Sequence, residues 1–180
     1  MFCIEIHQNR SSVDIITHIE LIVSKNMPQQ RSEWPKNLTN INDGIFRTLN
    51  GNADEMIGVG RCIKAGFPCA RVDVTNGRYD AIIDVGNSRL LRVQIKGTSG
   101  GSIRFIGGGR SGQQISRTVA QRTYKYSAKD CDIILAVDGR DGDCYIVPIA
   151  DIAQMGKQAS LKKLAKYKEN WNILKTLAGV

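Results

Sequence analysis

The sequence predicts an α/β domain built on a mixed sheet, and two observations predict it. Helical and extended patterns follow one another in the order helix, strands, helix, strands, helix. In addition, the turn signal DGRDGD separates two apolar runs, CDIILAV and CYIVPI, which are expected to pair as a hairpin. A chain of 180 residues with 42% hydrophobic residues is large enough for one well-packed domain.

Residues 1–45 are expected to form an N-terminal arm or a small helical element. A short alternating stretch comes first, followed by a helical apolar stripe that Ser11 or Ser12 can cap. The polar stretch 26–44 contains two prolines and is typical of a linker.

Residues 46–156 are expected to form the core of the domain. A helix is predicted from Asn52, as its cap, to Gly66, as its stop, so that Glu55 falls in the first turn. After this helix we expect short strands, a loop rich in Gly, Ser and Arg, a second helix and the closing hairpin. The expected ranges are 70–74, 79–85, 90–96 and 102–106 for the strands, 107–116 for the loop and 117–128 for the helix.

Residues 157–180 are predicted to form a basic C-terminal helix. Six lysines lie in this segment, and apolar side chains recur along one side of the expected helix at Leu161, Leu164, Tyr167 and Trp171.

The strands 79–85 and 90–96 are expected to form a hairpin with its turn centred on Asn87. This register makes one face entirely apolar and places Asp80 directly opposite Gln94 on the other face, with Lys96 next along the strand. A shift by one residue would bury Asp80 or Lys96, which is costly. The register therefore predicts that an acid, an amide and an ammonium group meet at one end of the hairpin.

This combination of side chains suits a magnesium site that acts on phosphate. Mg²⁺ prefers oxygen ligands and uses only one or two carboxylates, and a neighbouring lysine can stabilise charge that develops on a phosphate. Glu55 is the best candidate for a third oxygen ligand. Taken alone, Asp80 and Lys96 could equally form a surface ion pair worth about 0–1 kcal/mol.

The charge of the chain favours a polyanionic partner. The formal net charge is +8, and five basic residues surround the glycine-rich loop, where they are expected to contact DNA: Arg104, Arg110, Arg117, Arg122 and Lys125. The loop lacks the lysine of a phosphate-binding loop, so no nucleotide cofactor is expected.

Other classes of site and of location are excluded by composition. No apolar run is long enough for a membrane span, and no signal peptide is seen. The five scattered cysteines indicate reduced thiols and a cytoplasmic protein, and with only two histidines no structural zinc site is expected.

Three segments resemble, in order, the PD-(D/E)XK nuclease superfamily, and in particular the cyanobacterial group I intron homing endonucleases, which carry QxK instead of ExK. They are GNADEMIGVGRCIKAGF, with Gly51 and Glu55 in a Gly-x-x-x-Glu pattern, then GRYDAIIDVGNSRLLRVQIKG, and finally DIILAVDGRDGDCYIVPIADI. The resemblance covers about residues 50–152, and it departs from the family pattern at Tyr79, which stands where a proline would precede the aspartate.

The resemblance implies a restriction-endonuclease-like core whose active site lies on a β-hairpin. It implies Asp80, Gln94 and Glu55 as ligands of Mg²⁺, for which Mn²⁺ can substitute, and Lys96 as the catalytic lysine. The implied activity is hydrolysis of double-stranded DNA at specific sites by a restriction, homing or repair enzyme. Cleavage of both strands further favours a homodimer or a tetramer. The alternative is a catalytically inactive DNA-binding module, in which Gln94 replaces a lost acid.

Overall fold

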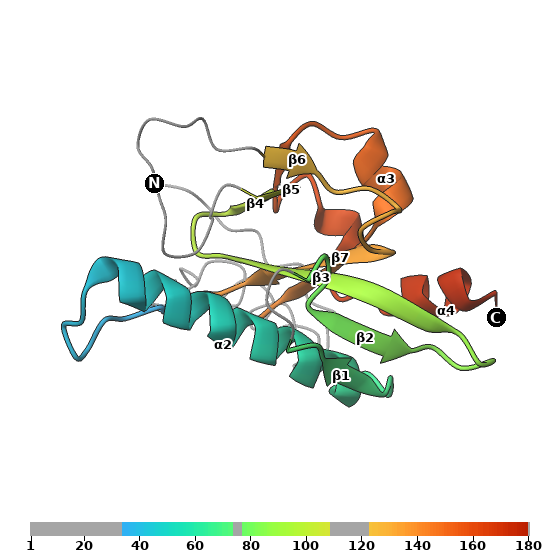
Figure 1. The fold of residues 1–180 in the computed structure, drawn as a ribbon, viewed down its shortest axis with the longest axis horizontal. Helices are drawn as coiled ribbons and strands as arrows, with labels where there is room; N and C mark the ends of the chain where they lie inside the picture. The colour runs from blue at the N-terminus through green and yellow to red at the C-terminus, as the bar shows by residue number, and fades with distance from the viewer. Residues whose placement is uncertain (1–33, 74–76, 109–122, 180) are drawn as a thin grey trace, which may run out of the picture. The chain divides into compact units, whose positions relative to one another are not determined.

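Helix α2 (Asp43–Lys64) lies along a five-stranded sheet in the computed structural model, which describes residues 34–73, 77–108 and 123–179 (Figure 1). All described residues belong to one compact unit, Ser32–Val180. The sheet has the order β1-β2-β3-β7-β8, in which only β3 and β7 run parallel. Its strands are β1 (Cys69–Arg71), β2 (Ala81–Asp84), β3 (Leu90–Thr98), β7 (Ile133–Asp138) and β8 (Cys144–Pro148). The predicted α/β architecture on a mixed sheet is therefore confirmed.

Each face of the sheet is covered by its own core. Alternate residues of β2 and β3, such as Ile83 and Val93, pack beneath α2 together with Leu174 of α4 (Asn172–Ala178). The opposite face carries Ile134 and Val147 and is covered by shorter elements. These elements are β4 (Ser102–Arg104), β5 (Ile106–Gly108), β6 (Thr123–Lys125), α3 (Ile149–Ala153), β9 (Gln158–Ser160) and the 3₁₀ helix η1 (Ala165–Tyr167).

The register of the β2–β3 hairpin is the predicted one. Ala81 pairs with Val93 and Asp84 with Leu90, and the turn between the strands holds Asn87 at a positive φ of 54°. The predicted apolar face is buried, because all of its side chains lie in the core under α2: Ala81, Ile83, Val85, Leu91, Val93 and Ile95. The alternation of apolar and polar residues fixed this register, since a slip would expose the whole set.

The cap of helix α2 lies ten residues before the predicted one. Asn42 caps it, with its side-chain oxygen accepting a hydrogen bond of 2.8 Å from the Gly44 amide. Asn52 therefore lies inside the helix, and the prediction that it caps the helix, with Glu55 in the first turn, is wrong. The stop was correct, since the helix ends at Lys64 and Gly66 has a φ of 91°.

Two glycines let α2 approach the sheet closely. A Cβ atom at Gly58 of α2 would lie 3.1 Å from Leu135, and one at Gly97 of β3 would lie only 1.6 Å from the Asp54 carboxylate. Asp54 thus fits over a strand position that has no side chain. Burial, and then repulsion by Asp138, raise the pKa of Asp54 to about 6.

The raised pKa of Asp54 predicts that the stability of the wild-type protein, relative to an Asp54→Asn variant, depends on pH. The pKa is higher in the folded than in the unfolded state, so ionising Asp54 costs folding free energy, and stability falls as the pH rises through about 6. Because Asp54 is partly solvated, we expect a cost of about 1 kcal/mol. The cost develops between the ordinary pKa of 3.8 and the folded pKa of about 6, so Asp54→Asn should leave the melting temperature nearly unchanged at about pH 3.5 and raise it at about pH 8, measured in chelator. An equal melting-temperature difference at both pH values would contradict this explanation.

The predicted helix at 117–128 is wrong where the structure describes it. Residues 123–125 form strand β6, which pairs with β5, and Tyr126 then enters the core on that side of the sheet. Aromatic side chains at alternate positions, Tyr124 and Tyr126, are the strand signal that basic residues on both sides obscured.

The predicted C-terminal helix is also wrong. Strand β9 comes first and pairs with β4, η1 follows, and only α4 is an α-helix. The spacing of Leu161, Leu164 and Tyr167 fits three residues per turn, and the amides of Leu164 and Tyr167 bond to carbonyls three residues earlier. Glu169, at a positive φ of 50°, then turns the chain, and its amide donates to the Cys144 carbonyl. The same apolar residues are buried, but by tighter turns than an α-helix makes.

Several predictions concern residues 1–33 and the loop around 109–122, which lie outside the described residues. The prediction of an N-terminal arm reaching residue 45 overlaps the first turn of α2. Four described cysteines are free: Cys62, Cys69, Cys131 and Cys144. Among the described helices, none combines the length and apolar composition that a membrane span requires.

Candidate active site

Asp80 lies where strand β2 begins and the edge of β3 becomes open. Beyond Val93, β3 is paired only with β7 within the described part of the sheet. The Asp80 carboxylate occupies this edge, and its Oδ2 accepts a hydrogen bond of 2.8 Å from the Ile95 amide. The Asp80 side chain thus accepts a backbone hydrogen bond from β3 at a position where β2 has already ended. This hydrogen bond fixes the position of the carboxylate.

Gln94 meets Asp80 as the register predicted. Its Nε2 donates to Asp80 Oδ2 and, at 3.3 Å, to the Ile95 carbonyl. The side chain is buried, since only 4% of Gln94 is exposed. Because the amide nitrogen is used in these contacts, the Gln94 carbonyl oxygen is the atom left to bind a cation.

Lys96 follows on the same side of β3 as Gln94. Its Nζ lies 5.3 Å from the centre of the Tyr126 ring, at a distance where the ring favours the charged ammonium. Lys96 also interacts electrostatically with both Asp80 and Glu55, and it favours the ionised form of each. Although Asp80 and Glu55 come from different elements, they therefore share one ammonium group.

Glu55 reaches the same place from helix α2. Since Asp54 sits over Gly97, the next residue of the helix turns toward the β1 side of the sheet. There Glu55 Oε2 lies 3.2 Å from Arg71 Nη2, at the end of β1. The helix prediction misplaced the start of α2, but Glu55 is nonetheless close to Asp80.

Burial disfavours the ionised forms of both carboxylates, although Lys96 and Arg71 act on each of them. Burial is the largest cause that raises the pKa of Glu55, and repulsion by Asp80 comes next. Burial also raises the pKa of Asp80, against the opposing effects of the Ile95 amide and Lys96. A cation bound between them would relieve both effects.

The available atoms suit Mg²⁺ better than zinc. Two carboxylates and one amide oxygen are hard ligands, and they leave coordination positions for water and phosphate. Within the described ranges, no cluster of three or more His, Cys, Asp or Glu side chains is arranged to hold a metal. The oxygen atoms available to a divalent ion at this edge belong to Glu55, Asp80 and Gln94, the amide oxygen being the third.

A cavity of about 590 Å³ opens next to these residues. Asp54 and Gly97, the direct neighbours in sequence of Glu55 and Lys96, line it together with Thr98. The cavity continues between the first half of α2 and the turn after β3, where Arg47 and Ser99 contribute. Glu55, Asp80, Gln94 and Lys96 do not themselves line it.

The five residues predicted to contact DNA differ in their exposure and in their contacts. Arg104 is exposed on β4, between two buried residues. Lys125 donates to the carbonyls of Ala153, at 3.2 Å, and of Met155, and so holds the end of α3. Arg110, Arg117 and Arg122 lie outside the described residues.

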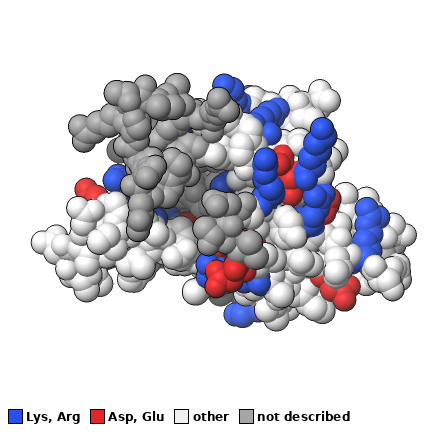
Figure 2. Space-filling model, in the orientation of Figure 1, with Lys and Arg blue, Asp and Glu red and all other residues white. Residues whose placement is uncertain are grey.

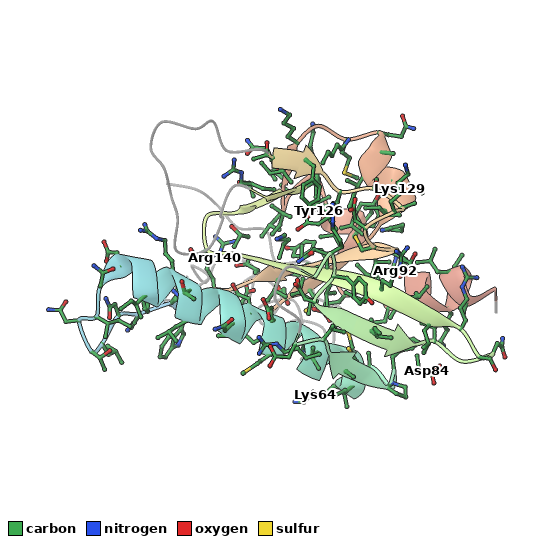
Figure 3. The ribbon with its side chains drawn as sticks, viewed as in Figure 1. Lys64, Asp84, Arg92, Tyr126, Lys129 and Arg140 are labelled. Atoms are coloured by element: carbon green, nitrogen blue, oxygen red, sulfur yellow. The ribbon has the colours of Figure 1, made fainter. Side chains whose placement is uncertain are left out.

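Basic side chains also lie on the face drawn in Figure 2, around the positions that Figure 3 labels Arg92 and Lys129. Blue basic and red acidic atoms alternate there. Arg92 there is paired with Asp132 at 2.9 Å, and Arg78 with Asp130 at 2.8 Å. Much of the charge on this part of the surface is therefore neutralised within the protein.

Two residues of the site were not found from the sequence. Arg71 was included in a predicted strand but given no role, and Tyr126 was assigned to a helix. An arginine among the alternating residues of a short strand carries no signal of its own, because its partner Glu55 is distant in sequence. The aromatic pair Tyr124 and Tyr126 was the signal that could have revealed the second residue.

Comparison with known families agrees with this geometry. A family model described as PD-(D/E)XK endonuclease matches residues 47–176. The chain belongs to this endonuclease family. The match spans most of α2, the hairpin with Asp80, Gln94 and Lys96, and the C-terminal elements as far as residue 176 in α4.

A solved structure supports the fold of this PD-(D/E)XK chain. The bacterial homing endonuclease I-Ssp6803I matches with a TM-score of 0.57 and 21% identity, over 73% of this chain and 95% of the other. The predicted restriction-endonuclease-like fold is thereby confirmed. A search of curated proteins gave no match.

Proposed function

We propose that this PD-(D/E)XK endonuclease is a magnesium-dependent enzyme that hydrolyses phosphodiester bonds at specific sites in double-stranded DNA. The observation that supports it most is the convergence of Glu55, Asp80, Gln94 and Lys96 at the open edge of β3. The net charge of +8 suits a DNA ligand.

Each residue has a distinct part in this proposal. Asp80 and Glu55 provide carboxylate oxygens and Gln94 its carbonyl oxygen for Mg²⁺, or for Mn²⁺ in its place. The bound ion would supply Lewis-acid polarisation of the scissile phosphate. The Lys96 ammonium, held beside Tyr126, stabilises the negative charge that grows on the phosphoryl oxygens as water attacks phosphorus and the sugar oxygen departs. The Ile95 amide keeps Asp80 in place throughout.

Contact with the DNA backbone completes the proposal. Arg104, Arg110, Arg117, Arg122 and Lys125 are its predicted phosphate ligands, and Lys125 would have to leave two carbonyls to reach DNA. A homodimer or tetramer would bring two sites to the two strands of a duplex. The bacterial homing endonuclease that shares the fold favours a homing or restriction role over repair.

The function is tested by incubating supercoiled plasmid with the purified protein in magnesium, in manganese and in chelator. Nicked and linear products should form with either metal and should be absent in chelator. If the protein binds the plasmid but leaves it intact with both metals, the inactive DNA-binding module is the correct function.

Gln94 variants test the amide as a ligand. In the free protein Gln94→Glu should bind Mn²⁺ about tenfold more tightly near pH 8, because a charged oxygen replaces a neutral one beside Asp80. Gln94→Ala should impair cleavage, since no oxygen remains opposite Asp80. Calorimetry of the free proteins measures the first effect and plasmid cleavage the second. If Gln94→Ala cleaves normally, Gln94 has no role in the site.

A further inference from the structure

Arg71 is the one basic side chain that reaches the candidate metal ligands from strand β1. It pairs with Ala81, whose side chain is buried beneath α2, and directly paired residues of antiparallel strands point to the same face. Arg71 is therefore directed toward α2, where its Nη2 lies 3.2 Å from Glu55 Oε2.

Arg71 acts electrostatically on both carboxylates. It favours the ionised form of Glu55, its direct partner, and also that of Asp80. Lys96 does the same, so two cationic side chains already face two carboxylates in the metal-free protein. A divalent cation added to this group would leave an excess of positive charge, which an incoming phosphate would neutralise.

A purely structural role explains the Arg71–Glu55 pair poorly. Their side chains are 36% and 25% exposed, and an ion pair with this exposure contributes about 0–1 kcal/mol. The same helix carries a comparable pair, Arg61 with Glu169, which joins α2 to the C-terminal segment. Arg61 is thus a natural control, because it makes the same kind of contact without facing Asp80.

We propose that Arg71 exchanges between two anions: in the DNA-free protein its guanidinium holds Glu55 and opposes metal binding, and with DNA it binds the phosphate next to the scissile bond. This inference rests on the proposed function. A guanidinium fits both partners, since it donates two parallel hydrogen bonds to a carboxylate or to a phosphate. The exchange would couple metal binding to DNA binding, so that the site fills with metal mainly when substrate is present.

The test is calorimetric titration of Mn²⁺ into the full chain, alone and with a mixed-sequence DNA duplex at low salt. Arg71→Ala should bind Mn²⁺ about tenfold more tightly than wild type without DNA, because one opposing charge is gone. The gain in Mn²⁺ affinity that DNA confers should shrink by a similar factor. Arg71→Lys, which keeps the charge, should stay within about threefold of wild type, and Arg61→Ala should match wild type.

Three results would count against the inference, and they can be told apart. If Arg71→Ala binds Mn²⁺ no more tightly than wild type, or if Arg61→Ala shows the same gain, Arg71 is only a structural partner of Glu55. If the double variant Glu55→Ala/Asp80→Ala binds Mn²⁺ as wild type does, the metal site itself is misassigned, and the proposed function falls together with the inference. Melting temperatures in chelator establish that each variant is folded.

Discussion

Lys96→Ala and Asp80→Ala are each expected to reduce DNA cleavage by about a thousandfold or more. Lys96 acts electrostatically on both Glu55 and Asp80, and Asp80 is the carboxylate fixed by the Ile95 amide. Each substitution removes a group that, directly or through the bound ion, stabilises charge at the reacting phosphate. The rate of cleavage should therefore decrease strongly, and the DNA affinity much less. Single-turnover cleavage and a gel-shift titration measure the two quantities separately.

Asp84→Ala is the matched control for Asp80→Ala. Asp84 belongs to the same strand and carries the same charge, but it is exposed and lies at the hairpin end far from Tyr126 (Figure 3). Its carboxylate accepts a hydrogen bond of 2.8 Å from the Gly86 amide in the turn. Wild-type cleavage is expected for this variant. If Asp80→Ala cleaved as fast as Asp84→Ala, the hairpin would not carry the active site.

Gly97→Ala is expected to cause the largest loss of stability. Its new Cβ would lie 1.6 Å from Asp54 Oδ2 and 2.6 Å from Asp54 Cβ, so α2 must move away from β3. We expect a loss of about 2–3 kcal/mol in the free energy of unfolding, measured by urea denaturation. Cleavage should fall as well, because Glu55 and Lys96 are the neighbours of the two colliding residues.

Gly60→Ala provides the control for this substitution. It is the same chemical change inside α2, but nothing lies within 4 Å of the added Cβ atom, so the variant should gain about 0.5–1 kcal/mol from helix propensity. Combining Gly97→Ala with Asp54→Gly should restore part of the lost stability, since the collision is removed. A Gly97→Ala protein as stable as wild type would show that α2 does not pack on β3 as described.

The part of the site on the hairpin could be predicted from sequence because one local rule determines it. Side chains alternate along a strand, and a single apolar face fixed which residues of β2 and β3 oppose each other. Asp80, Gln94 and Lys96 were brought together by that rule alone. Glu55 also lies near enough for Asp80 to act on it, although it was selected as an acid in the first turn of a helix whose start was misjudged.

The rest of the site depends on contacts that no local pattern encodes. Arg71 reaches Glu55 only because β1 adds to the far edge of the hairpin, and Tyr126 reaches Lys96 only because β6 pairs with β5. The C-terminal segment was misread because apolar residues three apart fit a 3₁₀ turn as well as an α-helix. Burial was therefore easier to predict than the backbone geometry that achieves it.

The metal site is tested most directly by an anomalous-scattering map from crystals of the protein with Mn²⁺ and duplex DNA. The proposed site predicts one strong peak at about 2.0–2.3 Å from oxygen atoms of Asp80 and Gln94, with Glu55 bound directly or through water and a DNA phosphate next to Lys96. A peak elsewhere, for example between Asp54 and Asp138, with none at Asp80, would contradict the metal site on which the account depends.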